Sequence, residues 1–233
     1  MNLKLSPLYL LSFLILVFLV HELHDWAHTL MARAVCPCWG MRVFDGWDFC
    51  PECFASAGQR ALATVAGPVI NFILLWIGWS LLNEDNQLDE QSLGCTIVLA
   101  CLPLNILLAA TAGGGDLTNA IRWLEPHDAR NNPHFVSLLG LLITAALTIP
   151  PLVRAFLRLP GYLGKFIVFP VFLLVPRWLD NWVVGIGLNR WLIKPGTDQA
   201  QAYTWVIAWL VLLLSGWFFT RRQPSKLMRE MTI

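Results

Sequence analysis

The strongest constraint on how this chain folds is a series of apolar segments, each about as long as a lipid bilayer is thick. A helix needs roughly 20 apolar residues to cross the hydrocarbon core. Such segments are clear at about residues 8–34, 61–82, 93–112, 135–153 and 203–220. Residues 155–200 are ambiguous, because Pro170 and Pro176 interrupt their apolar runs. They could form re-entrant or interfacial pieces, or two further spans.

The composition agrees with this pattern. The chain has 233 residues, of which 57% are hydrophobic and only 13% are charged, a balance typical of a membrane protein. We therefore predict an all-α fold: a polytopic transmembrane helical bundle of five to seven spans, with a small cysteine-bearing loop after the first. Residues 1–125 would form a membrane core with the candidate site, and residues 126–233 would add membrane helices of unknown role. The expected surrounding is the lipid bilayer, and the net charge of +1 indicates no nucleic-acid partner.

The distribution of positive charge predicts an orientation. Basic residues follow the first, third and last spans, whereas the loop between the second and third spans is acidic. The basic residues are Arg33, Arg42, Arg60, Arg122, Arg130, Arg221, Arg222, Lys226 and Arg229, and the acidic ones are Glu84, Asp85, Asp89 and Glu90. Because basic loops stay in the cytoplasm, the N-terminus would lie outside and the end of the first span near the cytoplasmic face. The segment 155–200 would then cross zero or two times.

A candidate metal site lies at the end of the first apolar segment. His24 and His28 are four residues apart, so on a helix they share one face and can grip one zinc ion. Asp25 follows the first histidine and could activate a metal-bound water. Asp116, after Gly113–Gly115, is expected at the same depth as a third ligand, although it could instead be a helix N-cap. Three such ligands leave a fourth position open for water, as in catalytic zinc sites. The alternative is that both histidines are buried and bonded to neighbours.

Two further ionisable residues precede this pair. At about 100° per residue, His21 and Asp25 fall on the face of His24, while Glu22 lies to the side. Asp25 is therefore a better candidate base than Glu22. His21 could orient a ligand, act as an alternative ligand, or simply be a polar residue on the helix face.

Four cysteines form a second cluster in the loop after the first span. Cys36 and Cys38 form a C-x-C pair, and Cys50 and Cys53 form a C-x-x-C pair. Since the predicted orientation places this loop in the reducing cytoplasm, four thiolates around a structural zinc ion are favoured over disulfides. The alternative is a hairpin with unligated thiols.

Three stretches resemble motifs of the site-2 protease family of intramembrane zinc metalloproteases. His24-Asp25-Trp26-Ala27-His28, with Ala32-Arg33 after it, resembles the His-Glu-x-x-His motif. Ala66-Gly67-Pro68-Val69-Ile70-Asn71 is similar to the Gly-x-x-x-Asn motif. Asn105 and Asp116 resemble the Asn and Asp of the last motif. The resemblance covers about residues 8–125, in the family's order.

The resemblance implies a zinc metalloendopeptidase that hydrolyses peptide bonds of membrane-embedded protein substrates. His24, His28 and Asp116 would hold the catalytic zinc, Asp25 would be the base, and Asn71 and Asn105 would bind substrate. This chain departs from the family in having Asp25 where the family has Glu, and Leu117 where it has Gly. Two alternatives stay open: a catalytically inactive metal-binding relative, and a metal-handling membrane protein.

Overall fold

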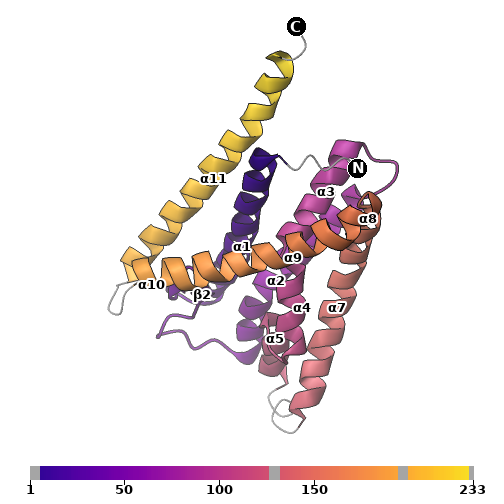
Figure 1. Ribbon diagram of the computed structural model, residues 1–233. Coiled ribbons are helices and arrows are strands. Elements are labelled where there is room, and N and C mark those ends of the chain that lie inside the picture. The colour runs from indigo at the N-terminus through magenta and orange to yellow at the C-terminus, as the bar shows by residue number, and fades with distance from the viewer. Residues whose placement is uncertain (1–5, 126–131, 194–198, 231–233) are drawn as a thin grey trace.

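The structure, a computed structural model, describes residues 6–125, 132–193 and 199–230 and is a bundle of long helices with one small hairpin (Figure 1). Six helices in this described part are long and apolar enough to cross a membrane. They are Pro7–Val35, Ala57–Leu81, Leu88–Thr111, Pro133–Arg158, Gly161–Leu192 and Gln199–Phe218. The predicted polytopic helical fold is therefore confirmed, and so is the cysteine-bearing segment after the first helix.

The first two long helices form the centre of the bundle. Helix α1 (Pro7–Val35) begins at Ser6, whose side chain accepts a hydrogen bond from the backbone of Tyr9 at 3.2 Å. Helix α2 (Ala57–Leu81) begins with a capping box, in which the side chains of Ser56 and Gln59 each satisfy the other's backbone N–H. The two helices pack side by side, so the far end of α1 lies against the beginning of α2.

The third span is broken, and the break delivers a polar residue to the bundle. Helix α3 (Leu88–Ala100) ends where Leu102 adopts a left-handed conformation with a φ of 50°. Helix α4 (Pro103–Thr111) continues the span, and the turn Gly113–Gly115 then starts α5 (Asp116–Leu124). Gly113 and Gly115 have φ angles of 71° and 82°, which glycine adopts without steric cost. This turn places Asp116 beside α2, against which α5 packs.

The ambiguous middle segment is one long inclined helix. After α7 (Pro133–Arg158), it runs through α8 (Gly161–Leu163), η1 (Gly164–Val168), α9 (Phe169–Asp180), η2 (Asn181–Leu188) and α10 (Asn189–Leu192). It crosses the bundle obliquely in Figure 1. Pro170 lies in the first turn of α9, directly after the wide turns of η1, so its missing N–H does not end the helix. By length and composition this segment is one candidate span, whereas the predicted orientation required zero or two crossings.

Helix α11 (Gln199–Glu230) runs back along α1, and α7 packs on α2, α4 and α5. Both helices therefore pack on the part of the chain before residue 125. A separate role for residues 126–233 stays a prediction.

A small hairpin closes one end of the bundle between α1 and α2. Strands β1 (Arg42–Val43) and β2 (Gly46–Trp47) are antiparallel. Phe44, in the turn between them, is fully buried in a cluster with Val184 of η2 and Val206 of α11. The hairpin is thus fixed to the late helices as well as to α1.

Candidate metal centre

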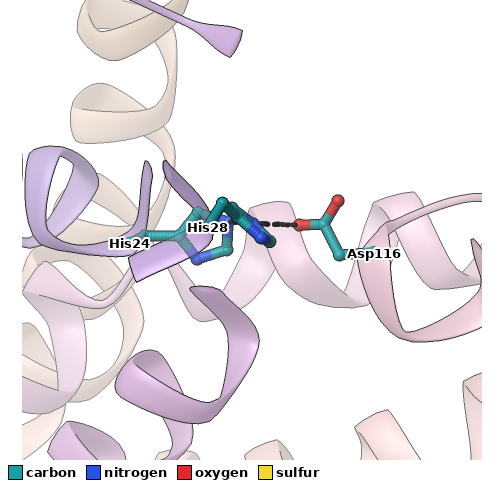
Figure 2. Close-up of side chains that lie close together, drawn as sticks. All are labelled: His24, His28 and Asp116. Atoms are coloured by element: carbon teal, nitrogen blue, oxygen red, sulfur yellow. Dashed lines mark hydrogen bonds and ion pairs between the residues drawn. The ribbon is translucent and has the colours of Figure 1, made fainter. Parts of the chain in front are cut away.

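Three predicted ligands converge on one point. Nε2 of His24 lies 3.1 Å from Nε2 of His28 and 3.1 Å from Oδ2 of Asp116, and Nε2 of His28 lies 3.4 Å from the same oxygen. Figure 2 shows the carboxylate of Asp116 pointing toward the two imidazoles. Zinc bonds of about 2.0–2.2 Å in a tetrahedron place ligand atoms roughly 3.3–3.6 Å apart. The group therefore has close to the spacing of three zinc ligands.

The protein fixes the orientation of His28. Its Nδ1 lies 2.7 Å from the backbone oxygen of Ala63 on α2. Because a carbonyl oxygen can only accept, Nδ1 carries the proton and donates a hydrogen bond to that oxygen. The lone pair is then on Nε2, which faces His24 and Asp116. The indole of Trp47 stacks on the imidazole, with ring centroids 4.7 Å apart and planes 12° apart. This arrangement fits a metal ligand, because such histidines normally donate their other N–H to a fixed acceptor.

Gly67 on α2 gives the two imidazoles their room. A methyl group at this position would collide with Nε2 of both His28 and His24. Pro68 follows it within the same helix and also lines the cavity at the site. The similarity of this stretch to the Gly-x-x-x-Asn motif therefore has a local reason: the helix backbone must approach the histidines closely.

Asp116 is held ionised at the first position of α5. Burial alone would raise its pKa, but the neighbouring imidazoles of His24 and His28 outweigh burial and hold the pKa of Asp116 well below its usual range. Arg122 stabilises the turn before it, because Nη2 donates a hydrogen bond to the backbone oxygen of Gly113 at 2.6 Å. An ionised carboxylate in a fixed turn is what a metal ligand requires.

Asp25 has one oxygen held and one free. Nη1 of Arg42 lies 3.0 Å from its Oδ2, and Nε2 of His21 lies 3.7 Å from the same atom. No described residue forms a hydrogen bond or ion pair with Oδ1. Asp25 also lines the same cavity as the three ligands. Its position therefore suits a base that is held on one side and open on the other.

Arg42 was not identified from the sequence, where it counted only as a loop charge. Its side chain is 0% exposed and makes a second ion pair, from Nη2 to Oε2 of Glu22 at 2.9 Å, and Glu22 is equally buried. Glu22 does not line the cavity. This agrees with its predicted position to the side of the helix face that carries the metal ligands. His21 extends the charged group to α9, since its Nδ1 lies 3.1 Å from Oδ1 of Asp180.

One cavity of about 360 Å³ brings the predicted site residues together. Its walls include every residue predicted to bind metal, substrate or a proton at this site: His24, Asp25, His28, Asn71, Asn105 and Asp116. Asn71 is buried and its Oδ1 has no hydrogen-bond partner, while Asn105 is exposed at the edge of the cavity. Apolar side chains such as Val20, Phe72 and Ile106 complete the lining.

The four loop cysteines also lie together, but not as predicted. Cys36 is bonded to Cys53, and Cys38 to Cys50, with Cα atoms 5.5 Å and 6.0 Å apart. The expectation of a four-thiolate zinc site is therefore wrong for this structure, because sulfurs joined in disulfides are no longer thiolate ligands. It rested on a reducing compartment, which was itself inferred from the orientation.

Comparison with known proteins adds no relative: the chain matches no protein-family model, no curated protein and no solved structure. The class defined by the fold and the site is therefore a multi-pass helical membrane protein with a possible metal-binding group of two histidines and one aspartate.

Proposed function

We propose that this protein is a zinc-dependent endopeptidase that hydrolyses peptide bonds of membrane-embedded proteins. The observation that carries the proposal is the convergence of His24, His28 and Asp116 in a cavity that also holds a free oxygen of Asp25. Two imidazoles and one carboxylate are a typical catalytic ligand set, which leaves a coordination position open. When bound there, zinc would polarise the scissile carbonyl and acidify a water molecule.

Asp25 would take the proton from the attacking water. Within the described residues no group bonds its Oδ1, while Arg42 and His21 lie within ion-pair distance of Oδ2. An aspartate is one methylene shorter than the glutamate of the resembled motif, so its reach depends on this fixed position. Its conjugate acid could then donate the proton to the leaving amine, as general bases do in the second half of such reactions.

The remaining cavity walls suit a polypeptide chain. Asn71 is buried with an unpartnered side-chain oxygen, and its amide can bond a backbone group of an extended substrate or the oxyanion. The unwound turn Gly113–Gly115 borders the same cavity, and non-helical backbone at membrane depth is tolerated where it lines a polar cavity. Apolar walls such as Phe72 and Ile106 would accept apolar substrate side chains.

A catalytically inactive metal-binding protein is the second candidate, and one observation favours it. Arg42 is fully buried beside Asp25 and already compensates the charge that a base must keep available. An ion pair of this kind also suits a purely structural role.

The test compares proteins in which only Asp25 differs. The purified full-length protein in detergent is loaded with zinc and incubated with apolar transmembrane peptides, and the products are identified by mass spectrometry. We expect cleavage that a chelator abolishes and zinc restores. Asp25→Asn should retain zinc but lose about a hundredfold to ten-thousandfold in rate, because Asn cannot accept the proton. If wild type and Asp25→Asn are equally inactive while Asp25→Glu gains activity, the inactive relative is the correct assignment.

We further infer that the metal centre faces the extracytoplasmic side, opposite to the sequence-based expectation. Six spans place the start of α1 and the end of α11 at the same end of the bundle, as Figure 1 shows. Glu84 and Arg158 also lie there, joined by an ion pair of 2.8 Å. This end carries Arg154, Arg158, Lys165 and the basic tail of the sequence, and the opposite end carries a similar number of basic residues. The positive-inside rule is therefore compatible with a cytoplasmic position of this end.

The two disulfides support the same orientation, because disulfides form and persist in oxidising compartments. Single cysteines introduced at the exposed positions Gly58 and Asp85 test it. A membrane-impermeant maleimide should label Gly58→Cys in intact cells and Asp85→Cys only after lysis. The reverse pattern would restore the original orientation.

A further inference from the structure

A second hollow adjoins the metal site on the far side of Asp116. It has a volume of about 460 Å³ and shares two walls, Trp47 and Asp116, with the metal cavity. Its other walls come from the beginning of α2, the last turn of α5 and the segment after the hairpin, and include Arg60, Asn119, Arg122 and Trp123. The two hollows adjoin at Trp47 and Asp116, so an extended molecule that passes these side chains would occupy both.

Arg60 is fixed in this hollow with its charge uncompensated. Its guanidinium lies over two aromatic rings, 5.5 Å from the centroid of Phe49 and 5.0 Å from that of Trp123. Nε donates a hydrogen bond to the backbone oxygen of Ala55 at 3.2 Å. No described carboxylate lies within ion-pair distance of it, and its two Nη groups have no hydrogen-bond partner in the described chain. A planar pair of donors is therefore already oriented and free.

Arg122 also contributes charge, but two of its donors are already used within the chain. Its Nη1 bonds Oδ1 of Asn119 at 3.0 Å and its Nη2 bonds the backbone oxygen of Gly113. The hollow also has two carboxylates, neither of which forms an ion pair with Arg60. Asp48 is exposed, with its Oδ1 bonded to the backbone of Phe49, and Asp116 belongs to the proposed metal centre.

We propose that this hollow recognises a carboxylate side chain of the polypeptide that is cleaved, and that Arg60 determines this specificity. Guanidinium groups are planar and bind carboxylates through two parallel hydrogen bonds, and the two aromatic rings beside Arg60 keep its guanidinium oriented. The shared walls favour a residue of the same chain that lies in the metal cavity, a Glu or Asp close to the scissile bond. The inference rests on the proposed function for the identity of the ligand.

The experiment measures peptide binding for combinations of a substitution in the protein and a substitution in the peptide. Zinc-loaded Asp25→Asn protein, full length and in neutral detergent, is titrated against fluorescein-labelled apolar peptides of about 20 residues. Each peptide has an amidated C-terminus and one Glu, placed at successive positions, and a matched set has Gln. At one or two positions the Glu peptide should bind about tenfold more tightly than the Gln peptide, since a partly exposed charged hydrogen bond is lost.

The protein variants locate the effect. Adding Arg60→Gln should remove the preference for Glu and leave binding of the Gln peptide unchanged, whereas Arg60→Lys should keep part of it. Arg33→Gln is the matched control, because Arg33 also lies over a tryptophan ring, that of Trp39 at 5.7 Å, but outside both hollows. Zinc content shows that each variant is folded.

Each other outcome overturns the inference. Equal binding of Glu and Gln peptides at every position, no binding of either, or a Glu preference that survives Arg60→Gln would each refute it. Displacement of both peptides alike by an anionic lipid would assign the hollow to a headgroup instead. Peptide cleavage is measured separately with wild type. An Arg60-dependent Glu preference without any cleavage would refute only the peptidase, and cleavage without that preference would refute only the carboxylate site.

Discussion

Two faces of one helical segment show opposite ways of placing ionisable groups inside a membrane protein. On one face of α1, His24 and His28 meet Asp116 with three electron-pair donors less than 3.5 Å apart. To the side of it, Glu22 meets the cation of Arg42 at 2.9 Å, and Asp25, at the border between the two groups, meets the same cation at 3.0 Å. The first group of residues can bind a metal ion from outside the chain, whereas the second is neutralised by the guanidinium of Arg42. Because burial of charge is costly unless it is compensated, the ligand face makes sense as a metal site.

The largest expected effect breaks the ligand face. His28→Ala removes the ligand whose tautomer α2 fixes through Ala63, so only two ligands remain. We expect bound zinc to fall from about one ion per chain to a small fraction of that, measured by elemental analysis of purified protein. His134→Ala is the control, because His134 lies exposed on α7, and it should keep the zinc. Equal zinc loss in both variants, or in neither, would end the distinction between the two faces.

The next effect breaks the self-compensated face. Arg42→Met leaves Glu22 and Asp25 buried beside a neutral side chain. Removing one partner of a buried ion pair typically costs about 3–5 kcal/mol, so we expect a loss of that order in the free energy of unfolding, measured by denaturant titration in detergent micelles.

A rescue variant sharpens this prediction. Glu22→Leu combined with Arg42→Met removes the fully buried pair together, so part of the loss should return. Zinc content should stay near that of wild type in both variants, since neither residue belongs to the ligand group. A double variant as unstable as the sum of its parts would show that the two charges do not act as a pair.

The ligand face could be predicted from the sequence because its signals are local or topological. The four-residue spacing of His24 and His28 fixes a common helix face, and the order of the spans gives Asp116 the same depth. The turn before Asp116 is also a local feature, since Gly113 and Gly115 adopt positive φ angles. These signals need no knowledge of what lies opposite in the fold.

The self-compensated face could not be predicted, because its partner comes from a loop. In the sequence, Arg42 is one of several basic loop residues that serve only to predict the orientation. The hairpin folds it back against Glu22 and Asp25. The cysteine prediction depended on the predicted orientation, and the reversal of that orientation stays a proposal. In the sequence, Arg42 counts as a loop charge, and residues 161–192 are not recognised as one helix. These two interpretations place the loop in the cytoplasm, where thiolates are favoured over the disulfides of Cys36 and Cys38.

The smallest effect tests whether the ligand face is shaped by its neighbour rather than by its ligands alone. Gly67→Ala keeps every ligand but places a methyl group against Nε2 of His28 and of His24. The imidazoles must then move apart, because the backbone of α2 is packed against α1 and cannot yield freely. We expect zinc affinity to fall about ten- to a hundredfold, as for other residues that orient metal ligands, measured by competition with a chromophoric chelator. Gly58→Ala is the matched control on the same helix, since a methyl group at Gly58 meets nothing within 4 Å. If Gly67→Ala binds zinc as tightly as Gly58→Ala, the close approach of α2 serves helix packing alone, and the ligand face owes its geometry to α1 and the Asp116 turn.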